Sequence, residues 1–503
     1  MTAGQRRIIL RGCHALLGRD AVLSPGPVDI ILAEGRIRDI RPSGGELPGG
    51  EIVAAENRLA APGLVNGHYH SHEHFQKGRY DNLPLELWMN YVRPFAPLPL
   101  TARHVYLRTL VGAIEALRSG TTTIVDDMNV SPVLRPDHVE AAFRAYEDIG
   151  LRAYLGLSLM DKPFYRSVPF LEEECPAELL RRLDAGKRSA PEEIFDYASD
   201  LAANRNPKRH RVGFVVAPSA PQRCTTDFLR RCDDLAERHD LPLIIHAQET
   251  RLQVVTGHLL LGATPIEHLH RIGFLGKRVS LIHAVWLTPA EIELVAEAGA
   301  SVQHNPVSNL KLGSGLAPLR ALLDAGVNVS LGSDGCGSIE TANMQGVVAA
   351  TALLHKLRGD DFERWVGAKE AWRAGTLGGA AALGRAAELG ALEVGCLADL
   401  ALYRLDRIPF VPLNDPLRQL VFAETGASLD TVLVDGRIVM REGRLTGIDE
   451  AAVVAEIAAL HAELRPLIDG AEKAVEAIRP VYERIYRRCL THPLAADTYA
   501  ARL

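Results

Sequence analysis

Residues able to bind and use a metal ion follow apolar stretches at several places in the chain. The set consists of His68, His70, His246, His283, His304 and Asp334, with Glu249 three residues after His246. Side chains alternate along a strand, so His68 and His70 share one face, roughly 6–7 Å apart along the chain. Imidazole and carboxylate groups are ligands of zinc, iron and manganese. A bound ion of this kind lowers the pKa of water to about 7 and so supplies hydroxide at neutral pH.

Each of these residues also has an ordinary interpretation when taken alone. A histidine after an apolar strand is more often a core residue bonded to a backbone group. Asp334 precedes Gly335 and could be a turn residue. Glu249 could be a surface glutamate that favours the start of a helix. Their joint occurrence after successive apolar runs favours one metal centre, with Glu249 as a proton carrier.

The elements that must position these groups are eight apolar runs separated by helical stretches. The runs are the segment before His68 and residues 122–125, 152–157, 212–216, 243–246, 279–283, 300–304 and 327–331. Helices are expected between them, for example over 289–297 and 316–324. This alternation predicts an α/β fold, a (β/α)8 TIM-like barrel whose catalytic groups lie at the carboxyl ends of the strands.

A small β-sandwich built from both termini is expected beside the barrel. Glu34-Gly35 and Asp435-Gly436 each separate two short alternating runs, which is typical of β-hairpins. The predicted division is 1–60 and 386–447 for the two parts of the sandwich, 61–385 for the barrel and 448–503 for C-terminal helices. Residues 160–192 are too long for a simple connection and predict an insertion near the barrel mouth.

Composition limits the classes of partner. The formal net charge is −6, with no long basic run, so no nucleic-acid partner is expected. No apolar stretch of bilayer length occurs, so no membrane association is expected. Seven scattered cysteines without a Cys-x-x-Cys pair are typical of a cytoplasmic protein. A small-molecule substrate is expected, and a homo-oligomer is compatible with the sequence.

The motifs around these residues resemble the amidohydrolase superfamily. The resemblance covers residues 62–70, 246–249, 283–287, 304–315 and 332–335, and 390–400 resembles the return into the second domain. The nearest branch is that of cytosine, guanine and S-adenosylhomocysteine deaminases and triazine hydrolases. The resemblance implies that one divalent metal is ligated by His68, His70, His246 and Asp334.

The resemblance also implies catalytic roles for three residues. His283 would orient or polarise the water and the substrate, Asp334 would accept a proton from the water, and Glu249 would protonate a ring nitrogen. Binuclear relatives carry a lysine on strand four, and residues 212–220 contain none, so one metal is expected. Zinc is the first choice, with iron and manganese as alternatives.

Substrate contacts are expected from loops after the strands. Glu86 and Trp88 lie in a segment that resembles a substrate loop of the S-adenosylhomocysteine deaminases, although Trp88 could equally pack within its loop. Ser219 stands where related deaminases often have histidine, and Gln222 and His304 are further candidates.

The predicted function is metal-dependent hydrolysis of a non-peptide carbon–nitrogen bond, with deamination of an amidine-type nitrogen heterocycle as the first choice. Triazine dechlorination or dealkylamination is the alternative, because it needs the same attack by hydroxide. A catalytically inactive barrel that serves in protein interaction is a remote alternative, since the ligand set is complete.

Overall fold

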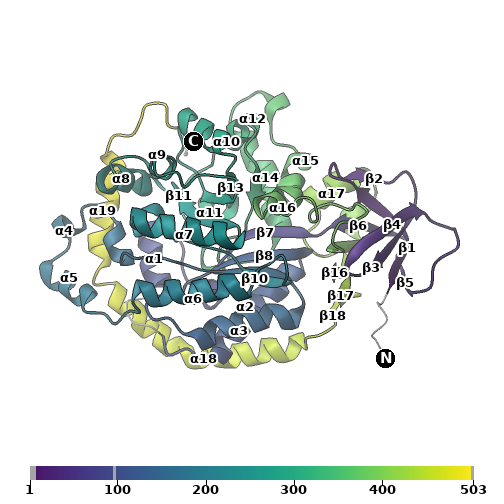
Figure 1. The fold of residues 1–503 in the computed structure, drawn as a ribbon, viewed down its shortest axis with the longest axis horizontal. Coiled ribbons are helices and arrows are strands. Elements are labelled where there is room, and N and C mark those ends of the chain that lie inside the picture. The colour runs from purple at the N-terminus through teal and green to yellow at the C-terminus, as the bar shows by residue number, and fades with distance from the viewer. Residues whose placement is uncertain (1–6, 94–97, 500–503) are drawn as a thin grey trace.

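The barrel predicted from the apolar runs is present in the computed structural model, which describes residues 7–93 and 98–499 (Figure 1). Eight parallel strands of the described residues form two four-stranded sheets, ordered β10-β9-β8-β7 and β11-β12-β13-β14. Their bounds are β7 Leu64–Tyr69, β8 Thr121–Met128, β9 Arg152–Leu157, β10 Val212–Phe214, β11 Leu243–Ala247, β12 Val279–His283, β13 Ser301–His304 and β14 Val329–Leu331. All eight expected runs therefore contain strands.

Two junctions close the sheets into a ring. At one, the Ile244 amide donates to the Val216 carbonyl at 3.0 Å, which links the chain after β10 to β11. At the other, the Asp334 amide donates to the His68 carbonyl at 2.9 Å, which links the end of β14 to β7. This second approach requires Gly332, because a Cβ there would lie 2.7 Å from the His68 Cβ. The closure therefore places Asp334 beside His68.

Helices cover the outside of the barrel (Figure 1). Those between the strands are α2 Ala102–Leu117, α3 Pro136–Ile149, α6 Pro191–Asn204, α7 Thr226–His239, α8 Arg251–Leu260, α9 Pro265–Arg271, α10 Pro289–Ala298, α11 Pro306–Lys311 and α12 Leu319–Asp324. After β14 follow α13 Cys336–Ile339, α14 Met344–Leu354, α15 Ala368–Arg373 and α16 Gly379–Ala382. The helix expected from 316 begins at Leu319, because Pro318 occupies the N-cap.

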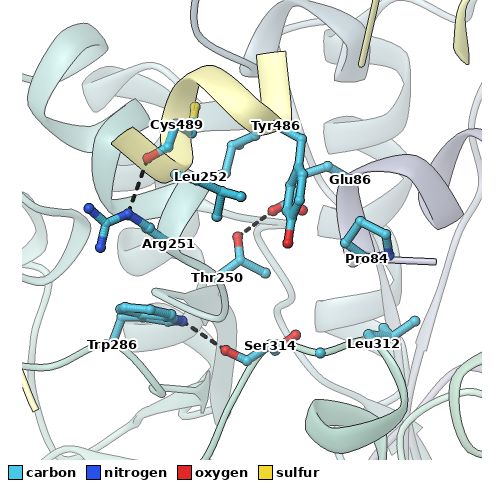
Figure 2. Close-up of a pocket in the computed structure, with 12 residues that line it drawn as sticks. Pro84, Glu86, Thr250, Arg251, Leu252, Trp286, Leu312, Ser314, Tyr486 and Cys489 are labelled. Carbon is cyan, nitrogen blue, oxygen red and sulfur yellow. Dashed lines mark hydrogen bonds between the residues drawn. The ribbon is translucent and has the colours of Figure 1, made fainter. Parts of the chain in front are cut away.

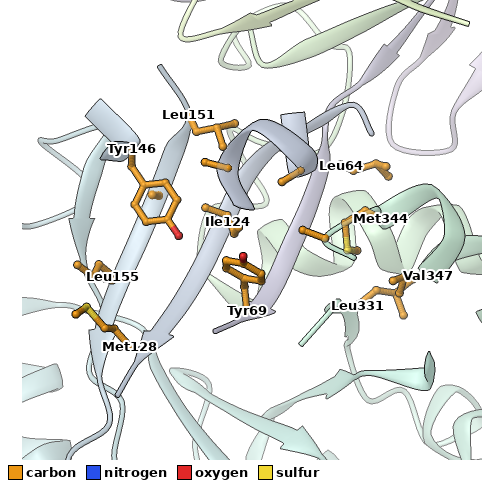
Figure 3. Packing of buried hydrophobic residues seen from close by; sticks show 14 of the residues in the cluster. Leu64, Tyr69, Ile124, Met128, Tyr146, Leu151, Leu155, Leu331, Met344 and Val347 are labelled. Carbon is orange, nitrogen blue, oxygen red and sulfur yellow. The ribbon is translucent and has the colours of Figure 1, made fainter. Parts of the chain in front are cut away.

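The largest hydrophobic core lies between the strands and these helices. Figure 3 shows Leu64 and Ile124 from the strands beside Tyr146 and Met344 from the helices. A smaller apolar cluster includes Val65, Val125, Tyr154, Ile244 and Ile282. These residues come from strands of both sheets, and such double-sided burial is why the strands are almost continuously apolar in sequence.

A mixed sheet beside the barrel combines strands from both ends of the chain. Its order is β18-β17-β16-β15-β6-β1-β3-β4, with β2 and β5 paired to β1. The bounds are β1 Ile8–Leu17, β2 Val22–Leu23, β3 Val28–Ala33, β4 Arg36–Pro42, β5 Glu51–Ala54, β6 Arg58–Pro62, β15 Leu400–Arg404, β16 Leu429–Val434, β17 Arg437–Arg441 and β18 Arg444–Leu445. The two-layered sandwich and the domain boundaries 1–60, 61–385, 386–447 and 448–503 stay predictions.

The two expected hairpin turns are confirmed and pack against each other. Glu34, Gly35, Asp435 and Gly436 all have positive φ, as the two-residue turn of a hairpin requires. A Cβ on Gly35 would lie 2.9 Å from Asp435 Oδ1. A buried ion pair then joins this sheet to the barrel, with Arg152 of β9 donating to Asp399 at 2.7 Å.

Further helices lie at the barrel mouth and along its side. Residues 160–192 contain the short helices α4 Leu171–Glu174 and α5 Ala177–Asp184. The C-terminal helices are α18 Glu450–Val475, which runs along α2, and α19 Arg479–Thr491, which packs on α8 and α1 Leu85–Val92 (Figure 1). A remaining helix, α17 Pro416–Phe422, precedes β16. Within the described ranges no helix has the length and apolar character needed to cross a bilayer.

Candidate metal centre and active site

Four histidines and one aspartate converge at the carboxyl ends of the barrel strands. His68 and His70 come from β7 and the residue after it, His246 from β11, His283 from β12 and Asp334 from the turn after β14. Potential ligand atoms of His68, His70 and His246 lie within 4.8 Å of one another, as do those of His68, His283 and Asp334. All five side chains are buried. The closed barrel thus brings together residues that are up to 266 positions apart in sequence.

Hydrogen bonds around this cluster orient its ligands. His70 Nδ1 lies 2.7 Å from the Asp127 carbonyl, and His246 Nδ1 lies 2.9 Å from the Ser219 carbonyl. A carbonyl can only accept, so both Nδ1 atoms carry the proton and both Nε2 atoms keep a free lone pair. Ser308 donates to Asp334 Oδ2 at 2.6 Å, and the Gly335 amide donates to Oδ1 at 2.8 Å. The same Oδ1 lies 3.5 Å from His68 Nε2 and 3.4 Å from His70 Nε2.

The donor set fits one divalent metal ion. Neither ring nitrogen of the fully buried His68 has a hydrogen-bond partner in the described structure, which is unfavourable without a ligand. Burial, together with the neighbouring imidazoles, holds the pKa of His68 and of His246 well below the usual value. Burial alone would raise the pKa of Asp334, but the histidines outweigh it and lower that pKa to about 2. Burial alone would lower the pKa of His70, but the charges of Glu73, Asp334 and Asp127 outweigh it and raise that pKa instead. Neutral imidazoles and an ionised carboxylate are the forms that bind metal, so at His70 a metal ion competes with a proton.

Glu249 faces this cluster from the loop after β11. Its Oε2 lies 3.6 Å from His283 Nε2, and the Ser314 hydroxyl lies 3.4 Å from its Oε1. Burial, followed by the charges of Asp334 and Glu86, raises the pKa of Glu249 well above its usual value. A carboxyl group that keeps its proton in this position can donate it to a substrate.

His283 is held in one orientation by the segment after β13. Its Nδ1 lies 2.8 Å from Asn309 Oδ1, so the Nε2 atom points toward Glu249 and Asp334. Gln248, His283, Ala284 and Asp334 all have positive φ, between 45° and 73°. Such left-handed conformations are uncommon outside glycine and cluster at functional sites. The barrel mouth therefore carries backbone strain at two of the residues expected to act, His283 and Asp334, and at two residues beside expected site residues.

Among the expected substrate contacts, Glu86 lies in a narrow pocket close to Glu249. Figure 2 shows Glu86 of α1 accepting a hydrogen bond from the Thr250 hydroxyl, with Tyr486 of α19 beside it. The pocket has a volume of about 10 Å³, which is room for one water molecule. The indole ring of Trp286 forms part of the pocket wall, and its Nε1 donates to the Ser314 carbonyl at 2.8 Å.

Trp88 lies outside this wall, in an apolar cluster with Leu85, Met89 and Leu312. Its Nε1 donates to the Gly337 carbonyl at 3.2 Å, and its ring is buried. Trp88 thus packs as part of α1 in a cluster with Leu312 and bonds to the chain at Gly337. Its contact with substrate stays a prediction.

The other expected contacts lie around the loop after β10 and at the end of β13. Ser219 accepts a hydrogen bond from Arg223 at 3.0 Å, and Gln222 is buried in the same loop. His304 is fully buried, and its Nε2 lies 2.9 Å from Nε2 of His355, 51 residues later. The structure therefore brings Ser219 to the metal cluster, through its carbonyl, but pairs His304 with a second histidine.

Several residues of the site escape the sequence patterns. Asp127 orients His70 through its carbonyl, and Ser308 and Asn309 hold Asp334 and His283. The only signal for Asp127 is its position at the end of an apolar run, directly after another aspartate. Ser308 and Asn309 lie within the motif 304–315, and their roles depend on contacts that spacing alone does not reveal.

Comparison with known proteins decides the family. The model of the amidohydrolase family matches residues 59–439, which include the eight barrel strands and, after them, β15 and β16. The chain belongs to the amidohydrolase family. This match confirms the resemblance seen in the motifs.

Relatives within the family are named as deaminases. A 5-methylthioadenosine/S-adenosylhomocysteine deaminase of Thermococcus kodakarensis is 33% identical over 434 residues, covering 86% of this chain and 94% of that protein. A 5'-deoxyadenosine deaminase of Methanocaldococcus jannaschii is 34% identical over 423 residues, covering 84% of this chain and 92% of that protein. The predicted reaction class is confirmed: this amidohydrolase is a metal-dependent hydrolase of non-peptide carbon–nitrogen bonds, of the deaminase type.

Solved structures show the same fold. An adenosine deaminase from Xanthomonas campestris with bound zinc has a TM-score of 0.81 and 28% identity, covering 91% of this chain and 98% of that one. An atrazine chlorohydrolase from Arthrobacter aurescens complexed with zinc also has a TM-score of 0.81, at 24% identity, covering 90% of this chain and all of that one. The second likeness is one of fold alone and carries no argument for triazine chemistry.

Proposed function

We propose that this amidohydrolase is a zinc-dependent aminohydrolase that removes the 6-amino group of an adenine nucleoside. Water replaces the amino group, so the products are ammonia and the corresponding hypoxanthine nucleoside. The observation that carries the proposal is the buried Glu249 carboxyl, whose Oε2 lies 3.6 Å from His283 Nε2 at the edge of the metal cluster, where burial raises its pKa. Deamination of a ring amidine needs a proton donor at that place. The relatives named as adenosine-type deaminases indicate that the ring is a purine.

His68, His70, His246 and Asp334 would hold the metal ion. When bound there, it supplies a water molecule whose pKa is lowered toward neutrality. The strand-four segment offers no lysine to bridge a second ion, so a single ion is the better fit. Zinc agrees with a site of three imidazoles and one carboxylate.

Three residues would act on protons during the reaction. Asp334 accepts one proton from water as the oxygen adds to C6, and Glu249 gives its proton to the adjacent ring nitrogen. Asp334 then protonates the amino group, the carbon–nitrogen bond breaks, and ammonia leaves. The remaining hydroxyl proton restores Glu249, while Nε2 of His283 holds the incoming oxygen by a hydrogen bond. One water is consumed for each ammonia released.

Glu86 is the best placed of the expected substrate contacts. It is buried beside Thr250 and contributes to the raised pKa of Glu249, so its carboxylate lies close to the reacting groups. A carboxylate in this position suits the hydroxyl groups of a ribose. Trp88, Ser219, Gln222 and His304 stay candidates, as do a cytoplasmic location and a homo-oligomer.

The test is ammonia release from a panel of compounds by the zinc-loaded protein. Adenosine and 5'-deoxyadenosine should yield one ammonia per molecule, with the change in ultraviolet absorption that accompanies conversion of adenine to hypoxanthine. Guanine, cytosine and a chlorotriazine serve as controls. Release of chloride or alkylamine from the triazine, with no ammonia from any adenine compound, would overturn the proposal.

A further inference from the structure

A large cavity lies beside the metal cluster and shares no lining residue with the narrow pocket at Glu86. Its volume is about 810 Å³, far more than the single water that the narrow pocket can hold. His72 and Asn129 line it, and the His72 ring lies 5.1 Å from the ring of the metal-site residue His70. This cavity therefore has room for a substantial part of a substrate whose reacting atom is at the metal.

The charged side chains of the cavity wall are mostly basic. They are Arg93, Arg108, Arg135, Lys162, Arg182, Lys187 and Arg188, against the acidic residues Asp161 and Glu472. Both acidic groups are already bonded elsewhere. Asp161 accepts from the Thr225 amide at 2.7 Å and from its hydroxyl, and Glu472 accepts from Arg79 at 2.9 Å and from Tyr80.

Two of the arginines lack an ion-pair partner among the described residues. Arg108 Nε and Arg93 Nη1 are buried atoms without a hydrogen-bond partner there. Only 6% of Arg108 is exposed, whereas Arg93 is half-buried. The neighbouring residues 94–97, Pro-Phe-Ala-Pro, carry no carboxylate. Burial lowers the pKa of Arg108 to about 10, so the group is still a cation at neutral pH.

Asp126 lies near Arg108, and Asp127 and Glu73 lie near Arg93, but none of them forms an ion pair with these arginines in the described structure. A buried cation without such a pair is stabilised when a ligand supplies the opposite charge. The guanidinium fork matches the oxygens of a phosphoryl group and can donate two hydrogen bonds to it. An α-amino acid substituent would fit less well, because its ammonium group would meet no uncommitted carboxylate in the described wall. The cavity thus favours a ligand that carries only negative charge.

We propose that the cavity binds a phosphoryl group on the 5' side of the purine substrate, so that the preferred substrate is an adenine nucleotide. This inference rests on the proposed function and narrows its substrate. Arg108 and Arg93 would bind the phosphoryl oxygens, and Lys162 and Lys187 would add positive charge at the wall.

The test compares kcat/KM of the zinc-loaded protein for AMP, ADP, adenosine and S-adenosylhomocysteine. A nucleotide should exceed adenosine by about tenfold or more, since hydrogen bonds to charged groups contribute that much. Arg108→Gln should lower kcat/KM for the nucleotide at least about tenfold more than for adenosine. The matched control is Arg103→Gln on the same helix, because Arg103 is exposed and pairs with Glu456 outside the cavity.

Equal kcat/KM for AMP and adenosine, with equal effects of Arg108→Gln on both, would overturn the inference while the proposed function stands. So would a preference for S-adenosylhomocysteine over both nucleotides. If Arg108→Gln does not fold, Lys162→Gln provides the same comparison. If no adenine compound is deaminated, the proposed function fails, and the cavity is then tested by adding pyrophosphate to the protein. A rise in Tm that is absent in Arg108→Gln supports an anion site in the cavity. No rise in Tm refutes it.

Discussion

Replacement of Glu249 by glutamine removes one proton from the site and little else. The two side chains have the same shape, and burial raises the pKa of Glu249, so glutamine replaces the protonated carboxyl by another neutral group. Its polar contacts are long, 3.4 Å from Ser314 and 3.5 Å from Gln253. The free energy of unfolding should therefore change by no more than about 0.5 kcal/mol, as for substitutions that leave packing intact.

The expected loss lies in turnover. A positioned general acid contributes about 10²- to 10⁴-fold, which corresponds to about 2.7–5.4 kcal/mol in the activation free energy. The assay is kcat for ammonia release, with bound zinc measured on the same sample. The control is Glu237→Gln, an exposed residue of α7 that lies outside the metal cluster. A Glu249→Gln protein that keeps stoichiometric zinc and a near-normal kcat would refute the role of Glu249.

Three further predictions concern metal, pH and stability. His246→Ala should lose zinc, to below about 0.2 ions per chain by elemental analysis, because one of its imidazole ligands is gone; stoichiometric zinc would show that the ligand set is wrong. The kcat/KM should fall as pH rises through the raised pKa of Glu249, because the acid must be protonated, and the Glu249→Gln profile should lack this limb. Arg152→Met should lower the free energy of urea unfolding by about 3–5 kcal/mol, because it leaves the buried Asp399 carboxylate without its arginine partner. The control is Arg103→Met at the surface, which should lower it by less than about 1 kcal/mol. A loss that small for Arg152→Met would contradict the prediction.

The sequence predicts the barrel and the metal cluster well because both depend on local pattern. Each apolar run forms a strand, and the carboxyl ends of parallel strands meet at one face, so His68, His246 and Asp334 must converge. Strand boundaries are predicted less well. The last strand begins at Val329 rather than at 327, although the Asn328 carbonyl still accepts a hydrogen bond from the Val302 amide at 2.9 Å.

What the sequence cannot predict are contacts between distant segments that follow no repeat. The pairing of His304 with His355 and the packing of Trp88 against Leu312 depend on how the loops settle over the barrel. Arg93 follows the end of α1 and Arg108 lies in α2, and nothing in their spacing shows that both line one cavity. Tyr486 reaches the Glu86 pocket from the C-terminal helix, about 400 positions away.

The most direct test of the central claim is a titration of the metal-free protein with zinc, followed by ammonia release from an adenine nucleoside. Activity should rise in proportion to added zinc and level off at one ion per chain, as a single site of His68, His70, His246 and Asp334 requires. Activity that needs a second equivalent, or no ammonia at any zinc concentration, would contradict a single-metal deaminase.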